Sequence, residues 1–444
     1  MDLMQFVPVF GNFAFMIVAF VVALSVIVAI HEYGHYIVGR WCGIHAEVFS
    51  LGFGPVIYSR KDARGTVWQV AALPLGGYVK FLGDANAASV GSDGTVADSD
   101  ARRTMTGAPL WARTLTVAAG PVFNFILAIA IFTGSIMYQG RVAEPFTIGA
   151  IRALPAETPS DLREGDVLLA VEGIAFIDPT REVSLLDLVP LQDRLTYQIM
   201  RDGQTRDVEG PYLMPPVVIA LAPRSAADDA GLRIGDVIRT VDGDPIFAFR
   251  QLQEKVIAAE GAPLDLTVWR QGRDLNVTLA PRITDEPQPQ GGFAQTYRIG
   301  ISGDIVFSPQ TEAVGILEAG RLGVEGLWNT ATTSLSALRH IIIGQISTCN
   351  LSGPVGIAET SGSMARQGTQ SFIWFIGALS AAVGLINLFP IPVLDGGHLM
   401  FYAYEGVTRR KPSERAVQVF MFIGLALILT MLSFTILNDT IFCP

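Results

Sequence analysis

The first membrane-length segment of the sequence ends in three ionisable side chains. No charged residue occurs from Leu3 to Ile30, and this run leads directly into AIHEYGHYIVGR at residues 29–40. About 20 apolar helical residues cross a hydrocarbon core of roughly 30 Å. Because the segment lacks a basic start and a cleavage site with small residues, we predict a retained membrane helix at 13–38 rather than a signal peptide.

The sequence HEYGH has the pattern H-E-x-x-H. On a helix this spacing puts His31 and His35 on one face, one turn apart, where their imidazoles can share one metal ion. Glu32 projects beside the metal, where it can take a proton from a water molecule. The alternative is a pair of histidines hydrogen-bonded in a helical core. Ionisable residues at the end of an apolar run are costly and usually functional, so the pattern favours zinc with Glu32 as the catalytic base.

A catalytic zinc site usually has three protein ligands and one open position. The best third candidate is Asp395 in NLFPIPVLDGGH at 387–398, where the inner end of a later span reaches the depth of HEYGH. Two prolines interrupt the helix before it, and irregular backbone at this depth is tolerated only beside a protein cavity or water. Gly396 and Gly397 would let the backbone turn tightly next to the ion. The alternative for Asp395 is an aspartate at a helix end that faces water.

The remaining polar candidates are weaker. His340 falls on the opposite side of the membrane, His45 is expected in an exposed loop, and His398 is expected to support the site without binding metal. Asn387 lies within the third span, where an unpaired amide is costly. We predict that its NH2 holds a substrate carbonyl or the oxyanion of a tetrahedral intermediate, although it could equally bond a neighbouring helix.

Lysine and arginine predict the orientation of the chain. Further spans are predicted at 113–139, 371–398 and 415–437. The loop between the first two spans and the loop between the last two carry clusters of Lys and Arg, within residues 40–113 and 409–415. The first 30 and the last 29 residues contain no Lys or Arg. Since cytoplasmic loops carry the excess of basic residues, both termini and the middle region are predicted outside. The net charge of -10 favours solubility of that middle region and gives no sign of a nucleic-acid partner.

The middle region contains a repeat. LREGDVLLAVEG at 162–173 and LRIGDVIRTVDG at 232–243 match at seven of twelve positions, and an RxG turn follows each copy. We therefore predict two copies of one small domain at 145–213 and 214–283. The pattern resembles the PDZ domain in the permuted form found in bacterial proteases. The alternative is a strand-entry turn in an unrelated β module.

The other segments have simpler patterns. Residues 46–83 alternate short β-rich runs with Gly and Pro turns, which predicts a membrane-associated β segment. The small polar residues at 84–107 predict a flexible cytoplasmic loop. Helical periodicity at 310–346 predicts an amphipathic segment at the outer membrane face. Cys349 and Cys443 both fall outside and could pair, but three cysteines are too few for a disulfide framework, so unpaired thiols are favoured.

The order of these motifs resembles the site-2 protease family of intramembrane zinc metalloproteases, and within it the bacterial proteases that regulate the sigma-E response. The segments that carry the resemblance are HEYGH, GFGP, PLGGYVK, AAGPVFNF, the repeated pair, SGPVGIA and NLFPIPVLDGGH. They cover nearly the whole chain. The resemblance implies zinc ligation by His31, His35 and Asp395, catalysis by Glu32, and substrate handling by Asn387.

The resemblance also implies a fold and a substrate. The fold is a multi-span α-helical membrane protein of the bacterial inner membrane, with four transmembrane helices, a membrane-associated β segment and two tandem periplasmic PDZ domains. The substrate is a single-span membrane protein, typically an anti-sigma factor that a site-1 protease has already cut on its periplasmic side. Cleavage would release a cytoplasmic fragment in an envelope stress response.

Two segments are implied to handle that substrate. PLGGYVK would offer a strand edge at Gly76, Gly77 and Tyr78 to an unwound substrate helix, because a helix must open before its peptide bond can be attacked. The PDZ domains would either exclude substrates with bulky outer domains or bind new C-termini, and the sequence leaves both possibilities open.

Two other functions fit parts of the sequence. One is a PDZ-bearing membrane scaffold or chaperone with a structural metal site, which Glu32 opposes because structural zinc takes four ligands and no base. The other is a membrane-anchored protease that acts on soluble peptides outside. The predicted topology opposes it, because HEYGH and the outer domains face opposite sides of the membrane.

Overall fold

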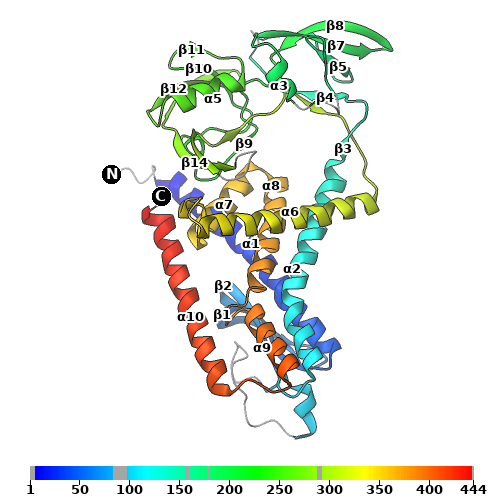
Figure 1. Cartoon of the computed structure of the whole chain (residues 1–444), viewed down its shortest axis with the longest axis vertical. Coiled ribbons are helices and arrows are strands. Elements are labelled where there is room, and N and C mark those ends of the chain that lie inside the picture. The colour runs from blue at the N-terminus through cyan, green and yellow to red at the C-terminus, as the bar shows by residue number, and fades with distance from the viewer. Residues whose placement is uncertain are drawn as a thin grey trace. The chain divides into compact units, whose positions relative to one another are not determined.

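The computed structural model describes residues 6–83, 98–155, 158, 160–177, 181, 183–287 and 293–442. The chain forms two compact units, shown in Figure 1. The first unit combines Met1–Ser135 with Ile316–Pro444, and the second is Ile136–Gly315. The first unit is mainly helical and the second mainly β.

Four helices in the described part of the first unit are long and apolar enough to cross a membrane. They are α1 (Phe6–Trp41), α2 (Leu110–Gln139), α8 (Thr369–Asn387) and α10 (Glu414–Leu437). This confirms the prediction of four membrane-length helices. Most large apolar side chains of α10 are exposed in the protein, as expected where lipid rather than protein surrounds a helix.

The third of these helices stops before the predicted metal ligand. Helix α8 ends at Asn387, and a new helix, α9 (Asp395–Thr408), begins after the irregular segment 388–394. Val393 in this segment has a φ of 87°, a strained value for a β-branched residue. A side chain on Gly396 or Gly397 would collide with carbonyl groups of the same segment. These glycines therefore let the first turn of α9 pack against the break, whereas the sequence predicted that they form the turn.

The β segment of the first unit consists of β1 (Ala46–Lys61) and β2 (Val67–Phe81). The first half of β1 lies between two parts of β2, since Leu51 pairs with Val70 on one side and with Gly77 on the other. Among the residues that the structure describes, 77–81 pair only with β1 and so form an edge of the sheet.

A hydrophobic core joins this sheet to the ends of α1 and α2. Phe49, Val79 and Tyr36 are buried in it, together with Met105 and Ala108. The prediction of a flexible loop at 84–107 is therefore wrong for its last part, where a 3-10 helix, η2 (Asp98–Arg103), is followed by residues of this core. Residues 84–97 of that loop lie outside the described residues.

The second unit contains two similar modules, each with a four-stranded antiparallel sheet. Their strand orders are β6-β5-β7-β8 and β11-β10-β12-β13. The strands of the first are β5 (Val167–Val171), β6 (Ile174–Ala175), β7 (Arg194–Arg201) and β8 (Gln204–Pro211), with the short helix α3 (Leu185–Leu188). Those of the second are β10 (Val237–Val241), β11 (Asp244–Pro245), β12 (Leu264–Arg270) and β13 (Arg273–Leu279), with α4 (Ala226–Asp229) and α5 (Phe249–Ala258).

The second module is inserted into the first. Strand β9 (Ala220–Leu221) pairs with β16 (Ile301–Ser302), and the equivalent β4 (Ile148–Ile151) pairs with β17 (Phe307–Pro309). A hairpin of β14 (Arg282–Pro287) and β15 (Phe293–Arg298) comes before these closing strands. The predicted boundaries at 145–213 and 214–283 are therefore wrong at their ends, because the strand that closes each module comes after residue 283.

The repeated Gly-Asp pair has a structural role in each module. Asp166 accepts two hydrogen bonds of 2.7 Å from Arg201, and Asp236 accepts two of 2.7 Å from Arg270. Both aspartates are almost fully buried. Burial alone would raise the pKa of Asp166, but the hydrogen bonds from Arg201 and the Arg163 N–H lower it. This pair therefore stabilises the module above about pH 4, and the contribution is lost as the pH falls through the lowered pKa.

We expect Arg201→Met to destabilise the first module by about 3–5 kcal/mol, because it leaves the buried Asp166 carboxylate without its partner. Faster hydrogen exchange in β5 and β7 of the full chain would report this loss. Arg194→Met is the matched control, because its ion pair with Glu209 on the same hairpin is exposed and worth about 1 kcal/mol or less. Equal exchange rates in the two variants would contradict the role given to Asp166.

Two further segments of the first unit differ from expectation. Helix α6 (Ile316–Ile342) exposes Leu317, Trp328 and Ile342, as an interfacial helix would. The predicted segment begins at residue 310, but residues 311–312 form strand β18 (Thr311–Glu312), which belongs, with its partner β3 (Arg141–Val142), to the second unit. Cys349 is disulfide-bonded and Cys42 is free, so the prediction of three unpaired thiols is wrong. Cys443 lies outside the described residues.

Helix α7 (Pro354–Gln367) comes between α6 and α8 in the sequence and packs against α1 and α8.

Candidate metal centre

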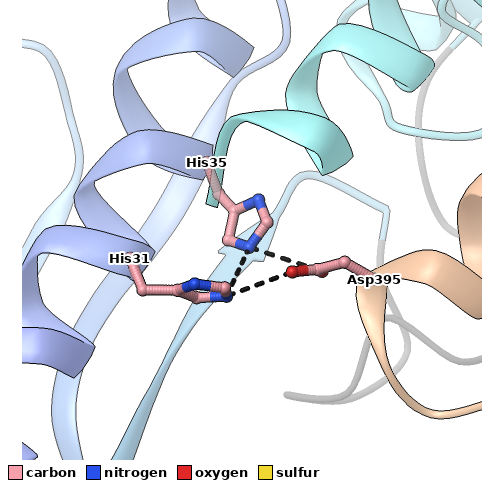
Figure 2. Close-up of side chains that lie close together, drawn as sticks. All are labelled: His31, His35 and Asp395. Carbon is pink, nitrogen blue, oxygen red and sulfur yellow. Dashed lines mark hydrogen bonds and ion pairs between the residues drawn. The ribbon is translucent and has the colours of Figure 1, made fainter. Parts of the chain in front are cut away.

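Helices α1 and α9 bring three potential metal ligands together, as Figure 2 shows. His31 Nε2 lies 3.2 Å from His35 Nε2 and 3.1 Å from Asp395 Oδ2. His35 Nε2 lies 3.5 Å from Asp395 Oδ1. The H-E-x-x-H spacing on α1 and the helix break before α9 thus place two nitrogens and a carboxylate around one point.

The geometry of this cluster fits a zinc ion. Ligand atoms at about 2.0–2.1 Å from zinc in a tetrahedron lie about 3.3 Å apart, close to the observed separations. The side chains are largely buried, with 12% of His31 and 16% of Asp395 exposed. Apart from the contact with His31 Nε2, Asp395 Oδ2 has no hydrogen-bond partner among the described residues. A buried carboxylate that faces two ring nitrogens is an arrangement that a shared cation stabilises.

Helix α2 forms the wall behind the two histidines. The Thr116 carbonyl lies 2.8 Å from His35 Nδ1, and Asn124 Nδ2 lies 3.1 Å from His31 Nδ1. Gly120 lies between them, one turn from each. A Cβ on Gly120 would lie 2.8 Å from His31 Cε1 and closer still to His35 Nε2. Sequence reasoning did not assign these residues, although their spacing of four within an apolar helix was a visible signal.

We expect Gly120→Ala to lower zinc occupancy strongly, because the added methyl group would displace both imidazoles. Zinc per chain after dialysis against a weak chelator measures this. Gly134→Ala in the same helix is the control, since a Cβ at Gly134 meets no atom within 4 Å. Gly134→Ala should therefore leave zinc occupancy unchanged. Ala is also favoured over Gly in a helix, by about 1 kcal/mol, so the control should not weaken α2. Unchanged zinc occupancy in Gly120→Ala would show that α2 does not pack closely against His31 and His35.

A cavity of about 390 Å³ opens beside the three ligand candidates. Its other lining residues include Glu32, Gly77, Tyr78 and Asn387. Gly77 packs against Glu32, since a Cβ on the glycine would lie 3.1 Å from Glu32 Cγ. The predicted base, the edge strand and Asn387 thus share one cavity with the metal cluster.

The other predicted residues lie as follows. Gly76 does not line the cavity; its φ of 156° favours glycine, and it lies against the Phe53 ring. The Asn387 NH2 donates to the carbonyl of Val383 in its own helix, at 3.1 Å. His398 lines the cavity but is not part of the three-ligand cluster.

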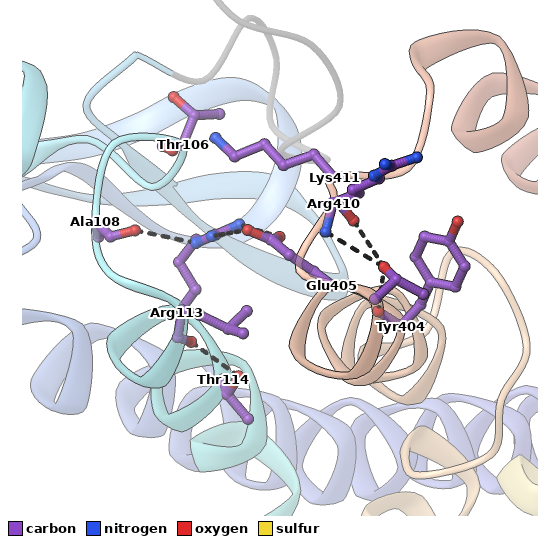
Figure 3. Close-up of polar contacts among 10 residues, drawn as sticks. Thr106, Ala108, Arg113, Thr114, Tyr404, Glu405, Arg410 and Lys411 are labelled. Carbon is purple, nitrogen blue, oxygen red and sulfur yellow. Dashed lines mark hydrogen bonds and ion pairs between the residues drawn. The ribbon is translucent and has the colours of Figure 1, made fainter.

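Arg113 of α2 also lines the cavity and forms a buried ion pair with Glu405 of α9, drawn in Figure 3. Arg113 donates to both carboxylate oxygens of Glu405, at 2.8 and 3.1 Å, and to the carbonyl of Ala108. Its guanidinium also lies over the Tyr402 ring. Asp395, Tyr402 and Glu405 lie at helical spacing on one side of α9. The ion pair therefore attaches α9 to α2 through the same face of α9 that carries Asp395.

The sequence is similar to a known protein family and to named bacterial proteins. The profile of peptidase family M50 matches residues 19–431. A protein of Rhizobium meliloti (strain 1021), named as a candidate zinc metalloprotease, is 34% identical over 96% of this chain and 97% of its own length. Proteins with similar names from Agrobacterium fabrum (strain C58) and Vibrio cholerae serotype O1 are 33% and 30% identical, each over 95% of this chain and over 95% and 97% of their own lengths.

Proposed function

The chain belongs to peptidase family M50, the site-2 protease family, and is a zinc metalloprotease; from this premise we propose that it cuts its substrate within the membrane. Its substrate would be a single-span membrane protein, cut within the transmembrane segment. The observation that carries the proposal is the cluster of His31, His35 and Asp395 on membrane-length and adjoining helices, with Glu32 in the same cavity.

We assign the chemistry to four side chains. His31, His35 and Asp395 would hold a zinc ion, which would supply Lewis acidity toward a peptide carbonyl and make a water molecule more acidic. Glu32 accepts a proton from the attacking water and returns it to the departing amine. Asn387 would donate to the substrate carbonyl after its NH2 leaves the Val383 carbonyl. Burial of the cluster supports this chemistry, because electrostatic effects are stronger where water is scarce.

The edge strand at residues 77–81 is proposed to bind the substrate. An unwound transmembrane segment can add to this edge as a further strand, and its peptide bonds would then pass beside Glu32. Glycine at 77 lets the strand lie directly against Glu32, and both Gly77 and Tyr78 line the cavity. Gly76, which lies outside the cavity lining, would act only through the conformation of the strand.

The two modules of the second unit carry the L-x-x-G-D pattern of PDZ domains, and we propose that they are a nested PDZ pair on the periplasmic side. They would exclude bulky substrates or bind new C-termini. The protein would lie in the bacterial inner membrane with both termini outside. The substrate class that fits is an anti-sigma factor already cut by a site-1 protease, which links the reaction to the sigma-E stress response.

A single-span reporter with a short outer tail tests this proposal. The purified protein with zinc is incubated with the reporter in detergent, and mass spectrometry locates the new termini. Cleavage within the transmembrane segment is the expected result. Zinc binding without cleavage of reporters with short or long tails would favour a scaffold with a structural metal site. Cleavage only in the outer tail would favour a protease for soluble peptides.

A further inference from the structure

The Asn124 side chain is fully buried on α2 and touches one of the proposed zinc ligands. Its Nδ2 lies 3.1 Å from His31 Nδ1. Its Oδ1 is buried without a hydrogen-bond partner among the residues that the structure describes. The backbone carbonyl of Asn124 accepts a hydrogen bond of 2.9 Å from Ser380 Oγ on α8, which fixes this part of α2. The position is rigid, yet one of its polar atoms is unsatisfied, which normally costs about 1–3 kcal/mol.

The chemistry of imidazole decides which atom of the amide should face His31. His31 Nε2 points to His35 Nε2 and Asp395, so a metal at that point would take the lone pair of Nε2. A neutral imidazole with a free lone pair on Nε2 carries its hydrogen on Nδ1 and donates from there. An amide NH2 has only hydrogens to offer, so two donors would meet. A rotation of the amide by 180° exchanges its nitrogen and oxygen without a change of shape.

His35 provides the pattern for comparison. Its Nδ1 faces the carbonyl of Thr116 at 2.8 Å, and a carbonyl can only accept. Nδ1 of His35 therefore carries the hydrogen, and Nε2 is left for a metal. Thr116 lies two turns before Asn124 on the same face of α2, with Gly120 between them.

On the basis of the proposed zinc site, we propose that Asn124 is a positioning residue whose side-chain oxygen accepts the hydrogen of His31 Nδ1 and thereby keeps Nε2 of His31 free for the metal. In this arrangement α2 supplies an acceptor to each histidine, one from the backbone and one from a side chain. The rotation gives the side-chain oxygen a donor in His31 Nδ1 and moves the NH2 to the position where the oxygen had no partner among the described residues. Such outer partners typically change metal affinity or activity 10–100-fold when they are lost.

Two variants distinguish a role of Asn124 as hydrogen-bond acceptor from a role in packing alone. Asn124→Asp keeps the shape and offers only oxygens, whereas Asn124→Leu keeps the approximate size and offers no acceptor. Zinc affinity of the full chain in detergent is measured by competition with a chromophoric chelator, and the absorption spectrum of the Co²⁺-loaded protein reports ligand geometry. Ser135→Ala, another buried polar position on α2, is the control.

We expect Asn124→Leu to bind zinc about 10–100-fold more weakly, with Asn124→Asp and Ser135→Ala close to wild type. Wild-type affinity in Asn124→Leu would overturn the role of Asn124. Equal loss in Asn124→Asp would also overturn it, and this second variant decides the matter if Asn124→Leu does not fold. Wild-type protein that binds no zinc at all would instead overturn the metal site, and the present inference with it.

Discussion

Glu32→Gln is expected to abolish peptide hydrolysis and to leave zinc binding intact. Glutamine has nearly the same shape as glutamate but cannot accept a proton at neutral pH, and a general base contributes about 10²–10⁴-fold to a rate. Glu32 lies in the cavity but is not one of the three clustered ligand candidates, so its exchange removes no metal ligand. The measurement pairs zinc per chain with the initial rate of reporter cleavage.

Glu47→Gln is the matched control for this experiment. Glu47 lies on β1 outside the cavity and forms a partly exposed ion pair with Lys80, so both zinc and cleavage should be retained. A Glu32→Gln variant that still cuts the reporter would show that another group is the base. A variant without zinc would show that Glu32 binds the metal itself.

Asp395→Ala is expected to lose both zinc and activity. Loss of an outer partner already costs about 10–100-fold in metal affinity, so loss of a direct ligand should cost at least about 100-fold. The exchange also leaves His31 and His35 next to each other without the carboxylate that both face. Zinc content after dialysis against a chelator, followed by cleavage with added zinc, measures both effects.

His398→Ala distinguishes the two possible third ligands on α9. His398 lines the cavity one turn after Asp395, but its ring is not part of the cluster. We expect this variant to keep its zinc. If His398→Ala lost zinc while Asp395→Ala retained it, the assignment of the third ligand would have to be exchanged.

The local part of this site could be predicted from the sequence because it depends on the period of one helix. The spacing of His31 and His35 is a property of α1 alone, and the four membrane-length helices follow from apolar runs. Asp395 could be predicted as a ligand because the direction of the third span determines which of its ends lies at the same membrane depth as His31 and His35. These features need no knowledge of how helices pack.

The contacts from α2 could not be predicted in this way. Thr116 acts through its backbone carbonyl, Gly120 through the absence of a side chain, and Asn124 through one atom of an amide. Each of these depends on which face of α2 meets α1. The nested closure of the two modules was missed for a related reason, since β16 and β17 contain only two and three residues and carry no periodicity of their own.

The origin of the ligands in distant parts of the chain has a consequence for biosynthesis. His35 and Asp395 are 360 residues apart in the sequence. At about 5–20 residues per second, roughly 20–70 seconds pass between the synthesis of one and of the other. During that time the nascent chain holds two histidines and Glu32 without a complete set of ligands. The three-ligand cluster therefore cannot form until the chain has been made as far as Asp395, so metal binding by all three side chains is a late event in synthesis.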